Sequence, residues 1–185
     1  MIHKLNNLRR LHFTYTIVFV FLTIGISISC KKQEPKTEQE QVIICDAEKT
    51  DFNHTIIKTS DKHYFSTNAH QQTSEEAFSG IYAMKSNYLQ PESFHIKISD
   101  LKTDEFFQVE VWRKGSKNGI IQVKDSTKKI LNLKSTKIIE TAENGWNKIL
   151  LKFTIHPYFD ANNIVITTFC NDTIPCFFDD LKITR

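Results

Sequence analysis

The sequence predicts an all-β domain, a two-sheet antiparallel β-sandwich, and three observations support that prediction. From residue 42 onward, apolar residues recur at every second position or in short blocks rich in Ile, Val, Phe and Thr, which is typical of strands. The stretches between these blocks contain Asn, Asp, Ser, Gly and Lys, which favour turns. No window of helical length keeps an apolar repeat of three to four residues. Short successive strands without helical crossovers pack as two antiparallel sheets.

The first 29 residues have the composition of a secretory signal peptide. Lys4, Arg9 and Arg10 precede an apolar run over 17–28, which is too short to span a bilayer stably. The run ends before Cys30 and resembles a bacterial lipoprotein signal. That resemblance implies cleavage before Cys30, a diacylglycerol on its sulfur, and an envelope protein anchored in the outer membrane, at its periplasmic face or at the cell surface. The alternatives are an ordinary signal peptide cut elsewhere and an uncleaved anchor helix, and all three place the folded part outside the cytoplasm.

The segment 30–41 follows the signal and contains no large apolar residue after Cys30, so we expect a lipidated cysteine on a disordered tether. The chain has 24 basic and 21 acidic side chains, and the three basic residues before Cys30 leave with the signal. The mature chain is therefore close to neutral. No basic patch remains that would indicate nucleic acid as a partner.

The sandwich domain is expected over 42–185, with one possible helical turn at 73–78. The expected strands are 42–46, 54–58, 62–66, 80–86, 93–99, 105–114, 119–124, 135–141, 147–155, 163–169 and 176–184.

Three cysteines remain once Cys30 is lipidated, so one thiol stays free or pairs between molecules. We favour a disulfide between Cys170 and Cys176, because a turn-rich insert separates them and the compartment is oxidising. A bridge from Cys45 to one of them and three buried reduced thiols are the alternatives.

Five segments, in order, resemble the carbohydrate-binding modules of the galactose-binding-like jelly-roll type. The segments are 44–48 (ICDAE), 75–84 (EEAFSGIYAM), 107–114 (FQVEVWRK), 145–149 (GWNKI) and 177–183 (FFDDLKI). The resemblance extends over essentially all of 42–185 and implies a jelly-roll sandwich that binds glycan.

The same resemblance implies a structural calcium ion. Its ligands would be Glu48, the carbonyl of Asp46, a carbonyl near Gly80 or Ile81, and Asp179. The pair Asp179-Asp180 also indicates a cation on its own, because an inward carboxylate in an apolar strand needs a cation or several donors. The alternative is that both carboxylates lie at a solvent-facing strand edge.

Aromatic side chains with polar neighbours are the candidates for binding sugar, because a pyranose ring stacks on an aromatic face while polar groups bind its hydroxyls. Alternation in 105–114 places Gln108, Glu110 and Trp112 opposite the apolar face of that strand, so we expect them on an exposed platform. Tyr158 and Phe159 form a second candidate, in a loop. The alternative is that Trp112 packs over the sandwich edge.

No catalytic constellation stands out: the histidines are dispersed and neither a nucleophile elbow nor a phosphate-binding glycine loop occurs. We therefore predict a non-catalytic, lipid-anchored carbohydrate-binding protein. The alternative is an envelope interaction or adhesion protein that binds a protein partner through the same sandwich, because fold alone does not fix function.

Overall fold

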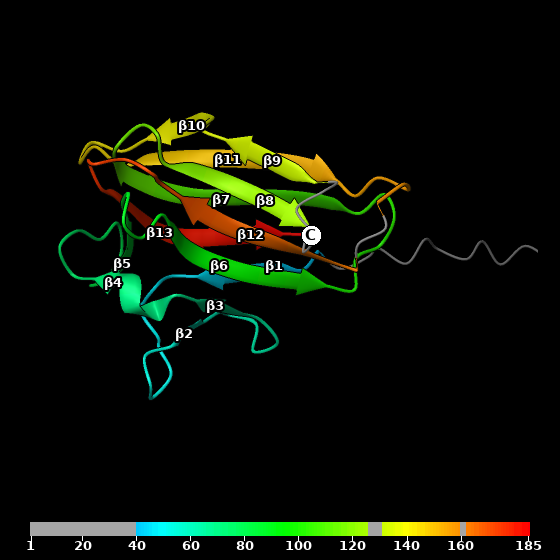
Figure 1. Ribbon diagram of the computed structural model, residues 1–185, viewed down its shortest axis with the longest axis horizontal. Helices are drawn as coiled ribbons and strands as arrows, with labels where there is room; N and C mark the ends of the chain where they lie inside the picture. The colour runs from blue at the N-terminus through cyan, green and yellow to red at the C-terminus, as the bar shows by residue number, and fades with distance from the viewer. Residues whose placement is uncertain (1–39, 126–130, 160–161) are drawn as a thin grey trace, which may run out of the picture. The chain divides into compact units, whose positions relative to one another are not determined.

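A computed structural model describes residues 40–125, 131–159 and 162–185 (Figure 1). The signal segment, Cys30 and the tether up to residue 39 lie outside the described residues. The strands are β1 (Val42–Cys45), β2 (Ile56–Lys58), β3 (Phe65–Thr67), β4 (Gln72–Thr73), β5 (Ala83–Ser86), β6 (Glu92–Ser99), β7 (Phe106–Gly115), β8 (Ile120–Asp125), β9 (Asn132–Ser135), β10 (Ile138–Thr141), β11 (Asn147–Thr154), β12 (Asn163–Phe169) and β13 (Cys176–Thr184). Within those ranges no helix is both long and apolar enough to cross a membrane.

The strands form two antiparallel sheets, which confirms the predicted fold class. The seven-stranded sheet has the order β10-β11-β7-β13-β5-β4, with β1 also paired to β13, and the six-stranded sheet has the order β2-β3-β6-β12-β8-β9. Figure 1 shows β6, β12 and β8 in front of β7, β11 and β13. The chain passes repeatedly from one sheet to the other, for example from β6 to β7 and on to β8, as expected of a jelly roll.

The core lies between the sheets and follows the predicted alternation. Phe107, Val109 and Val111 of β7 are fully buried and face Ile96 and Ile166 of the other sheet within one apolar cluster. Removing such side chains from water is the main favourable contribution to folding, at about 25 cal/mol per Å² of apolar surface. The pattern of the sequence therefore defines which face of each strand is inside.

Two short strands and one helical turn differ from expectation. β4 contains two residues and β9 is a polar strand at a sheet edge, so neither has enough buried side chains to produce an apolar pattern. The predicted turn at 73–78 is not helical, and the 3-10 helix of the described residues is Ala69–Gln71.

The two ends of the domain are held together. Gln41 and Arg185 exchange two backbone hydrogen bonds, of 2.9 and 3.0 Å, beside the pairing of β1 with β13.

Candidate functional site

An open depression of about 580 Å³ lies on the outer face of the six-stranded sheet. Its lining residues are His63, Tyr64, Phe65, Thr67, His95, Lys97, Ser99 and Asp100. The lining residues on β3 and β6 alternate with buried residues such as Ser66, Ile96 and Ile98 and project away from the core, whereas Tyr64 packs against it. We call the outer face of this sheet the His95 face.

Strand pairing arranges the His95 face in two rows. Ser66 pairs with Ile96, so the flanking residues of β3 lie opposite those of β6. Together with the register of the other strand pairs, this gives two rows of residues. The first is Ile56, Thr67, His95, Thr167, Gln122 and Lys134, and the second is Lys58, Phe65, Lys97, Val165, Lys124 and Asn132. Each row crosses all six strands and carries polar groups at most positions.

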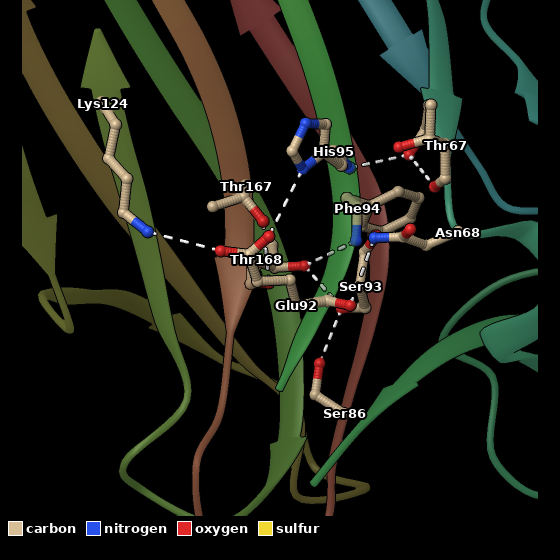
Figure 2. A network of polar contacts seen from close by, with 11 residues as sticks. Thr67, Asn68, Ser86, Glu92, Ser93, Phe94, His95, Lys124, Thr167 and Thr168 are labelled. Carbon is tan, nitrogen blue, oxygen red and sulfur yellow. Dashed lines mark hydrogen bonds and ion pairs between the residues drawn. The ribbon is translucent and has the colours of Figure 1, made fainter. Parts of the chain in front are cut away.

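Glu92 connects two basic side chains of this face. Its Oε1 lies 3.3 Å from Nζ of Lys124 and its Oε2 lies 3.5 Å from Nδ1 of His95. Figure 2 shows Glu92 between them. Lys124 lies on β8 and His95 on β6, on either side of β12. The glutamate thereby fixes the positions of both side chains.

The backbone of β6 below the face is anchored by side-chain hydroxyl and amide groups (Figure 2). The Ser66 hydroxyl accepts a 2.8 Å hydrogen bond from the backbone N–H of His95, and the Asn68 amide donates to the carbonyls of Glu92 and Ser93. Ser93 is bonded in turn to Thr168, at 2.7 Å. A face whose strands are held in this way keeps its side chains in place before a ligand arrives.

Aromatic surface adjoins these polar groups. Phe65 is 49% exposed, next to the half-buried Tyr64, whose hydroxyl accepts a 3.2 Å hydrogen bond from Arg185. Arg185 is itself paired with Glu105 at 2.7 Å. The depression therefore combines one accessible ring with hydroxyl, imidazole and ammonium groups, which is the chemistry that binds polyols.

The expectation that Trp112 is exposed is wrong. It lies on the predicted outer side of β7, but it is only 6% exposed, because Phe78 stacks on it with ring centroids 3.9 Å apart and Lys148 lies 4.6 Å from its ring centre. Trp112, Trp146, Ala83 and Phe177 form a small apolar cluster of their own. Trp112 is therefore a buried packing residue, but it lies on an inner strand of its sheet and not at the sandwich edge.

The other predicted ligand residues do not gather around Trp112. Gln108 and Glu110 are half-buried on the same outer side and bond to each other. Tyr158 is 86% exposed and Phe159 half-buried beyond the end of β11, which pairs with the start of β7 at Phe106. Phe106 and Trp112 are six positions apart on β7, or about 20 Å.

Glu48 and Asp179 hold the turn at Ser79-Gly80 from two sides. Oε1 of Glu48 accepts hydrogen bonds of 2.8 Å from the backbone N–H groups of Ile81 and Tyr82. Oδ2 of Asp179 accepts bonds of 2.9 and 3.0 Å from Phe78 and Ser79. The turn that carries Phe78 onto Trp112 is thus anchored by carboxylates from the first and last segments of the domain.

Burial disfavours the charged form of the two neighbouring carboxylates Asp179 and Asp180. Burial raises the pKa of Asp179 to about 7, and the neighbouring Asp180 adds to the rise. Burial also raises the pKa of Asp180, with the charges of Asp46 and Glu48 contributing, while Lys148 acts in the opposite direction.

Charge and oxygen chemistry at the turn fit a calcium ion, and the side chains alone do not complete its coordination. Within the described ranges, no group of three or more His, Cys, Asp and Glu residues is placed to hold a metal. Asp46 directs Oδ1 to the backbone N–H of Glu48, at 3.1 Å. A cation here would therefore rely on Glu48, Asp179 and backbone oxygens such as those near Gly80, and the calcium site stays a prediction.

The predicted Cys170–Cys176 disulfide is absent, because Cys45, Cys170 and Cys176 are all free and buried. The thiol of Cys176 lies 3.0 Å from the carbonyl of Ser116, and that of Cys170 lies 3.9 Å from the carbonyl of Ile174. Burial raises the pKa of Cys45 to about 12 and that of Cys176 well above its usual range. These buried free thiols pack as small apolar side chains, as in the alternative of three reduced cysteines.

The comparisons with known proteins give distant resemblances. No family model matches the chain. No curated protein matches it either. Among solved structures, a family 16 carbohydrate-binding module is 15% identical over 74% of this chain and 89% of its own, with a TM-score of 0.42. A CBM22 xylan-binding domain from Paenibacillus barcinonensis is 9% identical over 76% and 90%, with a TM-score of 0.42. A Stig cyclase from Fischerella sp. TAU is 10% identical over 77% and 82%, with a TM-score of 0.44.

Sequence reasoning missed the His95 face. Alternation in the predicted strand 93–99 was enough to place His95, Lys97 and Ser99 on one side, opposite Phe94, Ile96 and Ile98. Their juxtaposition with Phe65 depends on the pairing of β3 with β6, for which the sequence offers no local signal.

Proposed function

We propose that this protein is a non-catalytic carbohydrate-binding protein of the cell envelope, held at the outer membrane by a lipid on Cys30, and that it binds glycan on the His95 face. The observation that carries the proposal is the exposed ring of Phe65 in a depression lined by His95, Lys97, Thr67 and Ser99. The ring offers a stacking surface, and the neighbouring groups donate to and accept from sugar hydroxyls.

The test is a glycan array probed with the full chain in detergent, followed by affinity measurements on the best ligand with Phe65→Ala. Loss of the stacking ring should lower affinity about tenfold, or about 1.4 kcal/mol. The matched control is Phe106→Ala, because Phe106 is 50% exposed against 49% for Phe65 but lies on the seven-stranded sheet. Equal affinity of both variants would show that the His95 face is not the binding site. An array without any binding would refute glycan binding by this protein.

A protein partner is the second candidate, and exposed apolar residues at a sheet edge support it. β10 is an edge strand on which Ile138 and Ile139 are 49% and 44% exposed. Such an edge can pair with a strand of another chain. Ile138→Lys should abolish binding of such a partner and leave glycan binding unchanged.

A further inference from the structure

The His95 face carries an excess of positive charge. Its strands bear four lysines, Lys58, Lys97, Lys124 and Lys134, and two acidic residues, Glu92 and Asp125, of which Asp125 is buried. Lys124 is paired with Glu92, whereas Lys58, Lys97 and Lys134 form no ion pair with any residue that the structure describes. Asp100 stands at the end of the depression, beyond the last residue of β6.

Three lysines of the opposite sheet are held in ion pairs with glutamates. Lys85, Lys114 and Lys148 lie 2.7, 2.8 and 2.6 Å from carboxylate oxygens of Glu75, Glu76 and Glu140. Glu110 also faces Lys182 across neighbouring strands. Lys152 of β11 and Lys182 of β13 are exposed and also form no ion pair with a described residue, so the His95 face differs in having three of its lysines aligned in one row.

The lysines of the second row are regularly spaced. Lys58, Lys97 and Lys124 lie on β2, β6 and β8, with one intervening strand between each pair, which contributes Phe65 or Val165. Neighbouring strands are about 4.8 Å apart, so successive lysines are about 10 Å apart at the backbone. An extended chain lying across the strands would therefore meet a cation, then an apolar contact, then a cation.

We propose that the glycan bound by the His95 face is an acidic polysaccharide whose carboxylate or sulfate groups recur along the chain and contact Lys58, Lys97 and Lys124, with a sugar ring stacked on Phe65. The inference rests on the proposed function and specifies its ligand. Ammonium groups form charge-assisted hydrogen bonds with such anions, which are stronger than bonds to neutral hydroxyls. Regular spacing of the cations favours a repeating polymer over a single acidic sugar.

The experiment compares four immobilised polymers: polygalacturonate, a sulfated galactan, neutral xylan and double-stranded DNA. We expect the full chain in detergent to bind one or both acidic polysaccharides at least tenfold more tightly than xylan or DNA, with affinity falling as salt rises from 50 to 200 mM. Preference between carboxylate and sulfate identifies the acidic group. Lys97→Gln should lower affinity for the acidic polymer about tenfold, the loss of one charge-assisted contact. Lys152→Gln, an exposed lysine on β11 of the other sheet, should leave it unchanged.

The outcomes separate this inference from the function on which it rests. Binding of xylan as tight as that of the acidic polymers would overturn the inference and leave glycan binding intact. Equal binding of DNA and polygalacturonate would reduce the face to a nonspecific cationic surface and overturn it as well. Binding of no polysaccharide would overturn both proposals.

Discussion

The carboxylate of Glu48 occupies the space in which a side chain on Gly80 would begin. Gly80 has a φ of +62°, and a Cβ at that position would contact Oε1 and Cδ of Glu48. The same Oε1 accepts the hydrogen bonds from Ile81 and Tyr82. We expect Gly80→Ala to force Glu48 away and to lower the free energy of unfolding by about 3 kcal/mol, from left-handed strain and lost hydrogen bonds.

Gly145→Ala is the matched control for that variant. Gly145 has a φ of +82°, but a Cβ there would have no atom within 4 Å. The free energy of unfolding of Gly145→Ala should fall by only about 1–2 kcal/mol, the cost of the left-handed backbone for a residue with a Cβ. Chemical denaturation of both variants measures the difference, and equal destabilisation would show that the contact between Glu48 and Gly80 contributes nothing.

Trp112→Ala should be strongly destabilising and should not affect glycan affinity directly. Truncation of a buried Trp that stacks on Phe78 lowers the free energy of unfolding by about 3–5 kcal/mol. Phe52→Ala, at a site 97% exposed, should be close to neutral. Thermal melting compares the two, and a Trp112→Ala variant as stable as Phe52→Ala but defective in glycan binding would restore Trp112 to the ligand site.

Removal of calcium should lower the melting temperature, if the ion binds the turn held by Glu48 and Asp179. An ion that binds only the folded state stabilises it by about 2.7 kcal/mol at a hundred times its dissociation constant. Glu48→Gln should abolish the shift, whereas Glu140→Gln, whose carboxylate pairs with Lys148, should retain it. Identical wild-type melting curves with calcium and with chelator would exclude the site.

The stability of the calcium-free protein should fall as pH rises from about 4 to about 7. Burial raises the pKa of Asp179 from its ordinary value of 3.8 to about 7, so the folded state binds more protons than the unfolded state in this window. The stabilisation from the protonated group is complete below 3.8 and is lost as pH passes 7. Asp179→Asn should flatten this dependence in denaturant titrations, and an unchanged slope would contradict the assignment.

Lipidation at Cys30 is a prediction about a residue outside the described ranges. Cys30→Ala should move the protein from the membrane fraction to the soluble fraction, because the variant lacks the thiol that would carry the lipid. Metabolic labelling with palmitate checks the modification itself. Labelling that persists in the variant would place the lipid elsewhere.

The strands were predictable from the sequence because burial imposes the alternation that it displays. In β7, Phe107 and Val109 face the core and Gln108 does not, as their spacing indicates. The strands that escaped prediction, β4 and β9, are short or polar, and pairing with a neighbour defines them. Local pattern therefore predicts the interior of the sandwich better than its edges.

The surface was less predictable, because segments distant in the sequence determine it. Alternation placed Trp112 on the outer side of its strand, but the Phe78 turn that covers it depends on contacts with Asp179 near the other end of the chain. The His95 face likewise depends on long-range pairing of β3 with β6. Whether an outward-pointing side chain is exposed therefore depends on which other segments of the folded domain cover it.

Gln41 and Arg185 lie next to each other, so the domain can be circularly permuted: the strands would follow a different order along the chain and keep the same arrangement in space. A short linker between these two residues would close the domain head to tail, since they already exchange two backbone hydrogen bonds. The closed chain can then be opened at the turn between β5 and β6, where Tyr88 and Leu89 are 56% and 72% exposed. Such a circular permutant keeps every strand pair. Its new termini lie at the turn between β5 and β6, so a tether added there would hold the sandwich by that end.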